Sequence, residues 1–189
     1  MSRFLAGLIL GLLILPVGLI AYISTGQIPV GATESPMPFE RCLAGHAVHA
    51  RIRKLAPQRD VSSFTTADLV TGAEAYRKNC AMCHGLPQQA IPANSDNMFP
   101  QAPGLFTPDG MVTDDPVGVS YWKVQNGIRL SGMPSFKTVL SDQQMWDLGA
   151  LLARADKLPP EALAALRPPA APAATPPATA AAKPGKSAK

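Results

Sequence analysis

The chain has 189 residues, of which 47% are hydrophobic and 16% are charged, and its formal net charge is +4. This length suits one small domain with flanking segments, because a single domain typically has about 100–150 residues. Residues 66–155 hold six basic and eight acidic residues and show no basic stripe interleaved with aromatic residues, so the composition argues against nucleic-acid binding.

The chain begins with a long apolar segment. Residues 4–23 contain no charged side chain, and about 20 apolar residues are enough to cross a bilayer as a helix. A cleaved secretory signal also has a short basic start and an apolar centre. However, this run is longer than a usual signal core, and no A-x-A site follows Tyr22. We therefore expect residues 1–24 to be an uncleaved single-pass anchor, with Arg3 in the cytoplasm and the rest of the chain exported.

Residues 25–64 are predicted to link the anchor to a folded domain. The first part, residues 25–38, is rich in Gly, Pro, Ser and Thr, as connectors are. One amphipathic helix is expected over residues 39–55, because its apolar residues recur at near-helical spacing. These residues are Phe39, Leu43, Ala47 and Ile52.

Two histidines on this helix, His46 and His49, could bind a metal or substitute as an iron ligand. They lie at i and i+3 but have no carboxylate or cysteine companion at a suitable spacing. We interpret them as surface or interface residues.

A compact domain is predicted over residues 65–157. It starts with a helix that Thr66 would cap and that Gly85 would end. This helix leads into the sequence Cys80-Ala81-Met82-Cys83-His84, which has the form C-x-x-C-H. That motif attaches a c-type haem, because its two thiols add to the two porphyrin vinyl groups and its imidazole ligates the iron.

Two other chemistries use paired cysteines, a thiol-disulfide redox pair and a zinc site. The first normally lies within a βαβ pattern, and the second needs another ligand pair at similar spacing. Neither context is present in this sequence. We therefore predict one haem c per chain, covalently bound to Cys80 and Cys83, with His84 as an axial iron ligand. Cys42 is then left without a partner and is interpreted as a buried or idle thiol.

The rest of the domain is predicted to be a long loop followed by two helices. Residues 86–115 contain five prolines, and a loop of this length usually wraps something, here the porphyrin edge. A short helix is expected over residues 116–126, with Tyr121 and Trp122 placed in the haem pocket. Ser141 is expected to precede a last helix that Pro159-Pro160 stops. The Pro- and Ala-rich residues 158–189 are predicted to be disordered.

The second axial position decides whether a haem carries electrons or binds gases and substrates. Met133 offers a thioether in the segment Asn126-Gly127-Ile128-Arg129-Leu130-Ser131-Gly132-Met133-Pro134-Ser135-Phe136, which we call the methionine loop. Glycine and proline restrict this loop, and it lies just before the last predicted helix. We therefore predict Met133 as the distal ligand; Met82, Met98, Met111 and Met145 have no comparable setting.

With these motifs in the right order, residues 66–155 resemble a class I cytochrome c. The resemblance extends to Gly72 and Tyr76, which stand eight and four residues before Cys80 and would cross the C-terminal helix. The crossing partner in that family is usually aromatic, whereas the matching position here is Leu151. The resemblance also implies that a proline carbonyl accepts a hydrogen bond from the proximal imidazole, with Pro103 as the better candidate and Pro100 as the second.

Together these features predict an all-α protein that is an electron carrier and not a self-contained enzyme. It would be a membrane-anchored monohaem cytochrome c, with its haem domain on the periplasmic side of a bacterial inner membrane. A redox protein donor and a redox protein acceptor are expected as partners. Two alternatives remain: a fixed electron-transfer subunit of a membrane oxidoreductase or oxidase complex, and a gas sensor or peroxidase with an open iron site.

Overall fold

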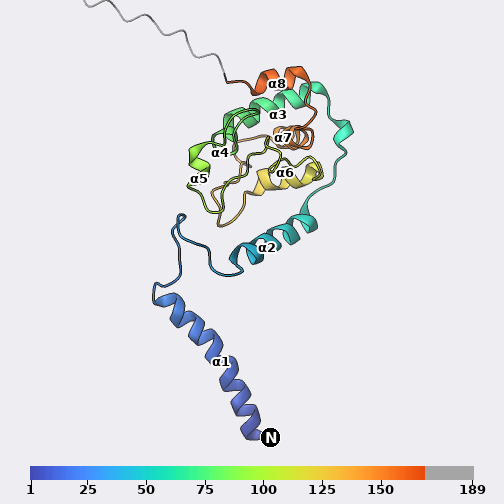
Figure 1. Cartoon of the computed structure of the whole chain (residues 1–189). Helices are drawn as coiled ribbons and strands as arrows, with labels where there is room; N and C mark the ends of the chain where they lie inside the picture. Colours follow the sequence, from blue (N-terminus) through green and yellow to red (C-terminus); the bar gives the residue numbers. More distant parts are fainter. Residues whose placement is uncertain (169–189) are drawn as a thin grey trace, which may run out of the picture.

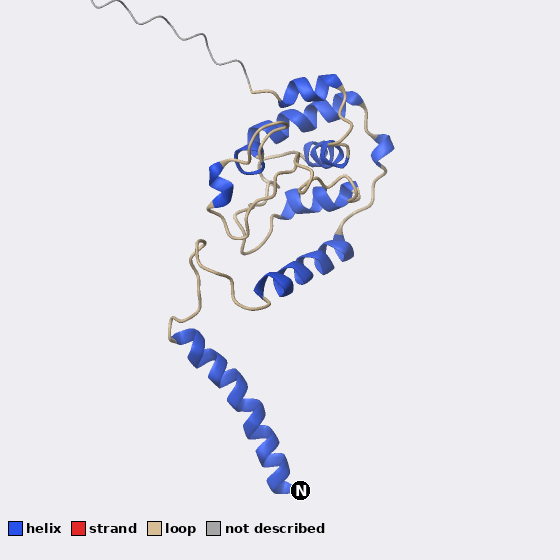
Figure 2. Ribbon diagram, viewed as in Figure 1, coloured by secondary structure: helices blue, strands red, loops and turns tan. Residues whose placement is uncertain are grey.

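The structure, a computed structural model, describes residues 1–168, and its regular elements in that range are all helical. The class predicted from sequence is therefore confirmed (Figure 2). Figure 1 shows a long N-terminal helix, then helix α2, then a compact group of helices. The elements are α1 (Ser2–Ser24), α2 (Glu40–Leu55), η1 (Val61–Ser63), α3 (Thr66–Asn79), α4 (Ala81–His84), α5 (Ala93–Asp96), α6 (Val117–Asn126), α7 (Asp142–Ala153) and α8 (Pro160–Leu166).

Helix α1 has the properties of a membrane-spanning segment. It contains 23 residues, none of which is buried against the rest of the described chain. At about 1.5 Å per residue its length is roughly 34 Å, and the hydrocarbon core of a bilayer is about 30 Å thick. Within residues 1–168 it is the one helix that is long and apolar enough to cross a membrane.

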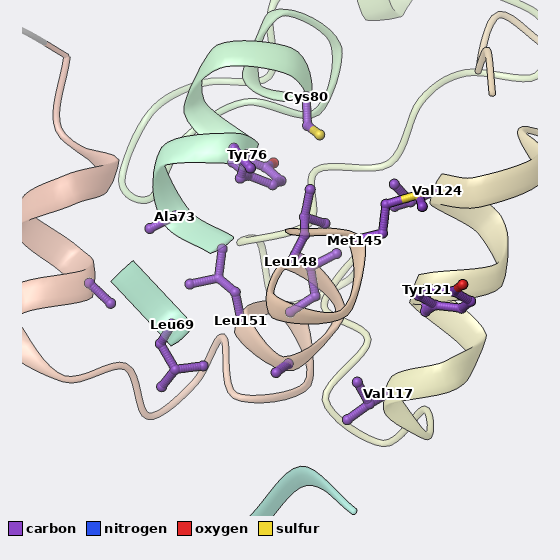
Figure 3. Close-up of a cluster of buried hydrophobic side chains, with 14 of the residues drawn as sticks. Leu69, Ala73, Tyr76, Cys80, Val117, Tyr121, Val124, Met145, Leu148 and Leu151 are labelled. Atoms are coloured by element: carbon purple, nitrogen blue, oxygen red, sulfur yellow. The ribbon is translucent and has the colours of Figure 1, made fainter. Parts of the chain in front are cut away.

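The core of the compact part is formed by three helices, with α7 packed between α3 and α6 (Figure 3). Leu148 and Leu151 of α7 are almost completely buried among side chains from both neighbours. Those neighbours are Leu69, Ala73 and Tyr76 of α3 and Val117, Tyr121 and Val124 of α6. Burial of such side chains stabilises the fold by roughly 1.5–3 kcal/mol each.

One glycine makes the crossing of α3 and α7 close. A Cβ atom on Gly72 would overlap the carbonyl group of Asp147 and lie 3.0 Å from the backbone nitrogen of Leu148. Because glycine has no side chain, the two backbones approach each other directly at this point. The crossing lies two turns before Cys80, so it determines how α3 presents that cysteine.

The start of α3 differs by one residue from the prediction. Thr65 is the N-cap, and it makes a capping box with Asp68 in which each side chain bonds the other residue's backbone N–H, at 3.3 and 2.7 Å. The prediction placed the cap at Thr66, but only Thr65 has an acidic residue three positions later. Ser141 caps α7 as predicted, in a capping box with Gln144.

The predicted disordered tail and the role given to Pro159-Pro160 are partly wrong. Helix α7 already ends at Ala153, and the two prolines begin helix α8, which packs on α3. A proline is favourable in the first turn of a helix, where its missing N–H would have no partner. Ala162 and Leu166 are 0% and 2% exposed, so this segment belongs to the compact part. The remainder of the predicted tail, residues 169–189, lies outside the described residues.

The helix predicted over residues 39–55 is present, but its apolar residues do not form one face. Ile52 is buried against the compact part, whereas Phe39 and Leu43 are 79% and 68% exposed. Leu43 and Ile52 are nine residues apart, which places them about half a turn from each other around the helix. Cys42 is also exposed, so it is not a buried thiol.

Candidate haem-binding site

The C-x-x-C-H residues lie on one short helical turn at the end of α3. Cys80 donates its backbone N–H to the Tyr76 carbonyl at 2.8 Å, and the N–H groups of Cys83 and His84 both reach the Cys80 carbonyl, at 3.0 and 2.9 Å. The Cys80 side chain is buried and that of Cys83 is half-buried. Burial raises the pKa of the Cys80 thiol to about 12, and the neighbouring Cys83 adds to this shift.

Tyr76 fixes the turn that follows the motif. Its ring is completely buried and packs edge-on against Phe106, with the ring centroids 5.1 Å apart. Its hydroxyl donates a hydrogen bond of 2.8 Å to the carbonyl of Gly85, whose φ of 73° takes the chain away from α4. Burial raises the Tyr76 pKa far above its ordinary value, so the hydroxyl stays protonated and remains a donor.

The His84 ring is oriented by one backbone contact. Its Nδ1 lies 2.8 Å from the carbonyl oxygen of Pro103, which can only accept a hydrogen bond. This is the bond that the resemblance implied, and it involves Pro103 and not Pro100. Burial lowers the pKa of the imidazole, although the bond to Pro103 acts in the opposite direction. The neutral ring therefore keeps its proton on Nδ1 and leaves Nε2 free to ligate a metal.

The segment that carries Pro103 is itself held in place. Ser95, at the end of the short helix α5, is completely buried, and its hydroxyl donates a 2.7 Å hydrogen bond to the carbonyl of Ala102. The long loop predicted over residues 86–115 is therefore interrupted by α5 and tied back on itself just before Pro103.

The methionine loop is braced by its own hydrogen bonds and by α6. Within the loop, Ile128 donates its N–H to the Met133 carbonyl at 3.1 Å, and the Ser131 hydroxyl accepts from the Met133 N–H at 3.1 Å. Two bonds join the loop to α6, from the Ser135 hydroxyl to the Gln125 carbonyl and from the Phe136 N–H to the Val124 carbonyl. Met133 is half-buried and packs against the hydrophobic core.

The sequence prediction gave Met98 no setting comparable to that of Met133, but the structure places this second thioether at the methionine loop. Met98 lies against Gly132, since a Cβ atom on that glycine would overlap the terminal methyl group of Met98. The two methionines come from segments more than thirty residues apart in the sequence, and no local pattern in residues 86–115 indicates the contact. By contrast, Met82 is 64% exposed and Met145 is buried in the helix core.

The structure gives Tyr121 contacts that join α6 to α7. Its ring stacks on Trp146 at a centroid distance of 4.1 Å, and its hydroxyl donates to Asp142 at 2.5 Å and accepts from Gln125 at 2.6 Å. Trp122 is half-buried on the same helix. A place for Tyr121 and Trp122 in a haem pocket stays a prediction.

The donor set fits a haem c. It comprises two thiols on one helical turn, an imidazole whose Nδ1 is engaged, and a thioether on a separately braced loop. A family model described as cytochrome C oxidase, cbb3-type, subunit III, matches residues 67–152, which include all of these groups. The chain carries a c-type cytochrome domain. No curated protein matches the chain.

The matched range separates the cytochrome domain from the elements around it. It runs from the first turn of α3 to the last turn of α7 and leaves out α1, α2 and α8. His46 and His49 lie exposed on α2, outside the cytochrome domain. Residues 1–168 contain no cluster of three or more His, Cys, Asp or Glu side chains that could hold a metal ion.

Proposed function

We propose that the protein is a membrane-anchored monohaem cytochrome c that carries single electrons between redox proteins. The observation that carries this proposal is the C-x-x-C-H turn whose His84 is bonded through Nδ1 to Pro103, together with the braced methionine loop. When bound, haem c supplies a one-electron Fe(III)/Fe(II) couple.

Each residue of the proposed site has a distinct task. Cys80 and Cys83 would bind the cofactor covalently, and the Pro103 carbonyl would orient the His84 ring so that Nε2 is available to ligate the iron. Met133 would supply the second iron ligand, and it would thereby exclude substrates and gases from the iron. A thioether opposite an imidazole favours the reduced state and raises the potential.

We further propose that α1 is retained as the anchor and that the cytochrome domain lies on the periplasmic side of a bacterial inner membrane. The length and apolar composition of α1 support retention. Intact mass spectrometry of the protein purified from membranes tests the retention of α1 and the covalent attachment of haem. The expected mass includes residues 1–24 and one covalent haem, and a mass that lacks the apolar segment would contradict the anchor.

The ligand assignment is tested with Met133→Ala and a matched control, Met98→Ala. The Met133 variant is expected to keep covalent haem, lose the weak far-red band of the oxidised Fe–S bond, bind carbon monoxide and have a lower potential. Met98→Ala removes the neighbouring thioether and is expected to keep the far-red band. If Met98→Ala loses the band and Met133→Ala keeps it, Met133 is not the ligand. A wild-type haem that binds carbon monoxide readily would favour a sensor or peroxidase instead.

A second candidate function is that of a fixed subunit in a membrane oxidase complex. The family match favours it, because that family is described as subunit III of a cbb3-type cytochrome c oxidase. Purification from membranes in mild detergent distinguishes the two functions. A fixed subunit co-purifies with other chains at constant stoichiometry, whereas a free carrier elutes alone.

A further inference from the structure

Helix α2 has an inner and an outer side. The inner side is turned toward the cytochrome domain, with Ile52 buried and Gly45 and Val48 half-buried. The backbone just after the helix is also tightly packed, since a Cβ atom on Gly118 of α6 would overlap the Pro57 carbonyl oxygen. Helix α2 is therefore fixed to the cytochrome domain.

The outer side of α2 is apolar at one end and basic at the other. Leu43, Ala47, Ala50 and Lys54 recur at intervals of four and three residues, and all four are exposed. Phe39 precedes them at the start of the helix and is 79% exposed. Around the helix axis, Arg51 lies on one side of Lys54 and Arg53 lies on the other. We call these seven residues the outer face of α2.

The charge of this region is strongly positive. Residues 39–59 contain five basic residues and one acidic residue. Arg51, Arg53 and Lys54 are exposed and make no salt bridge with any residue of the described chain. Exposed cations next to exposed apolar side chains are typical of helices that lie in the interface of a membrane containing anionic lipids.

The position of α2 brings it near a membrane. Helix α2 lies between α1 and the cytochrome domain (Figure 1). Its outer face is the exposed side of the helix, opposite the buried Ile52. Only residues 25–39 separate the end of α1 from the start of α2. Such a connector spans at most about 50 Å when fully extended. The start of α2 therefore lies within about 50 Å of the end of α1, which is close enough for α2 to reach the surface of the bilayer that α1 would cross.

We propose that the outer face of α2 binds the anionic phospholipid headgroups of the membrane that α1 crosses. Phe39 and Leu43 enter the boundary between headgroups and acyl chains, and Arg51, Arg53 and Lys54 pair with lipid phosphates. This inference rests on the proposed retention of α1 as an anchor. Because α2 is fixed to the cytochrome domain through Ile52 and Pro57, lipid binding would hold that domain in one orientation above the membrane.

The test uses the full-length holoprotein in nanodiscs of two compositions, phosphatidylcholine alone and phosphatidylcholine mixed with phosphatidylglycerol. Hydrogen exchange of residues 39–55 is followed by mass spectrometry. We expect exchange to be at least threefold slower in the anionic nanodiscs, and this protection to disappear at high salt because the Debye length shrinks. The exchange of α3 and α7 serves as the internal reference and should not differ between the lipids.

Two charge-reversed variants sharpen the test. The triple variant Arg51→Glu, Arg53→Glu and Lys54→Glu is expected to lose the protection. The control triple variant Lys78→Glu, Lys137→Glu and Lys157→Glu changes the same total charge at exposed sites outside α2 and outside the methionine loop, and it should keep the protection. Both variants should have the absorption spectrum of the wild type, which shows that the domain is folded.

Three outcomes would overturn the inference. If the protein co-elutes with both nanodiscs but α2 exchanges equally fast in each, the anchor stands and lipid binding by α2 is wrong. If the protein does not enter nanodiscs at all, the anchor is wrong and the inference fails with it. If α2 is protected in detergent in proportion to protein concentration, a second copy of the chain covers the outer face instead.

Discussion

Substitution of Tyr76 by phenylalanine should show how strongly the helix core supports the haem-attachment turn. The change removes one oxygen atom from a side chain of α3 whose ring is completely buried and packs against Phe106. That oxygen is the donor to the Gly85 carbonyl at 2.8 Å, and Gly85 directly follows His84. The phenyl ring itself fills the same space, so packing should change little.

The substitution is expected to lower the free energy of unfolding by about 2 kcal/mol. The Gly85 carbonyl is buried, and no second donor among residues 1–168 reaches it. A buried acceptor without a partner costs about 1–3 kcal/mol, more than the net value of an average hydrogen bond. A loss of 2 kcal/mol is about a 30-fold change in the unfolding equilibrium. With a guanidinium slope of about 3 kcal/mol per M, it shifts the midpoint of unfolding by about 0.7 M.

The assay is guanidinium unfolding of the holoprotein, followed by circular dichroism and by the far-red band of the oxidised haem. Tyr121→Phe is the matched control, because its hydroxyl also makes side-chain hydrogen bonds, but these are only partly buried, and the partner Asp142 is exposed and regains water when the bond is lost. We expect the control substitution to lower the free energy of unfolding by about 0.5–1 kcal/mol. Equal losses for both variants, or a loss below 0.5 kcal/mol for Tyr76→Phe, would refute the reasoning.

Three further predictions concern separate parts of the fold. Asp68→Asn should lower stability by a few tenths of a kcal/mol at neutral pH. Hydrogen bonds from Thr65 hold the pKa of Asp68 below its ordinary value of 3.8, so the ionised carboxylate stabilises the fold at higher pH. As the pH falls through the lowered pKa, Asp68 becomes neutral like asparagine. The difference between the denaturation curves of the variant and the wild type should then vanish. Leu166→Ala should cost about 3 kcal/mol in the same assay, whereas the more exposed Leu163 should tolerate alanine; equal effects would mean that α8 does not pack on α3. Gly127→Ala should keep covalent haem but weaken the far-red band, because φ there is 67° and the new Cβ would lie 2.7 Å from the Pro134 carbonyl carbon; an unchanged spectrum would contradict the bracing of the loop.

Local sequence patterns are sufficient to predict the helix ends and turns that depend only on neighbouring residues. The start of α7 and the end of α6 follow from Ser141 and Gly127, which act within a few residues of the helix ends. The C-x-x-C-H motif is likewise local, since its geometry needs only one helical turn. The bond between His84 and Pro103 was anticipated through the resemblance, because nothing in the composition of the long loop selects Pro103 over Pro100.

The errors occurred where contacts between distant segments decide the structure. Pro159-Pro160 was interpreted as a stop, but the buried surface that Leu166 finds on α3 allows the prolines to begin a helix. The sequence prediction placed Ile52 on the same face as Leu43, but nine residues make about two and a half helical turns, so the two side chains point in opposite directions. Contact with α6 through Pro57 turns Ile52 inward, which leaves Leu43 on the outside.

The arrangement of the three core helices explains how the two proposed axial ligands are held. His84 follows α3, and the methionine loop follows α6, and both of these helices pack against α7. Glycine permits close backbone approach on both sides of α7, at Gly72 of α3 and at Gly149, whose Cβ would lie 2.9 Å from the Val117 carbonyl oxygen. Loosening of α7 would therefore separate the two ligands while the covalent attachment at Cys80 and Cys83 persists. The bond to Met133 should thus be the first part of the site to fail under mild denaturation, before the helices unfold.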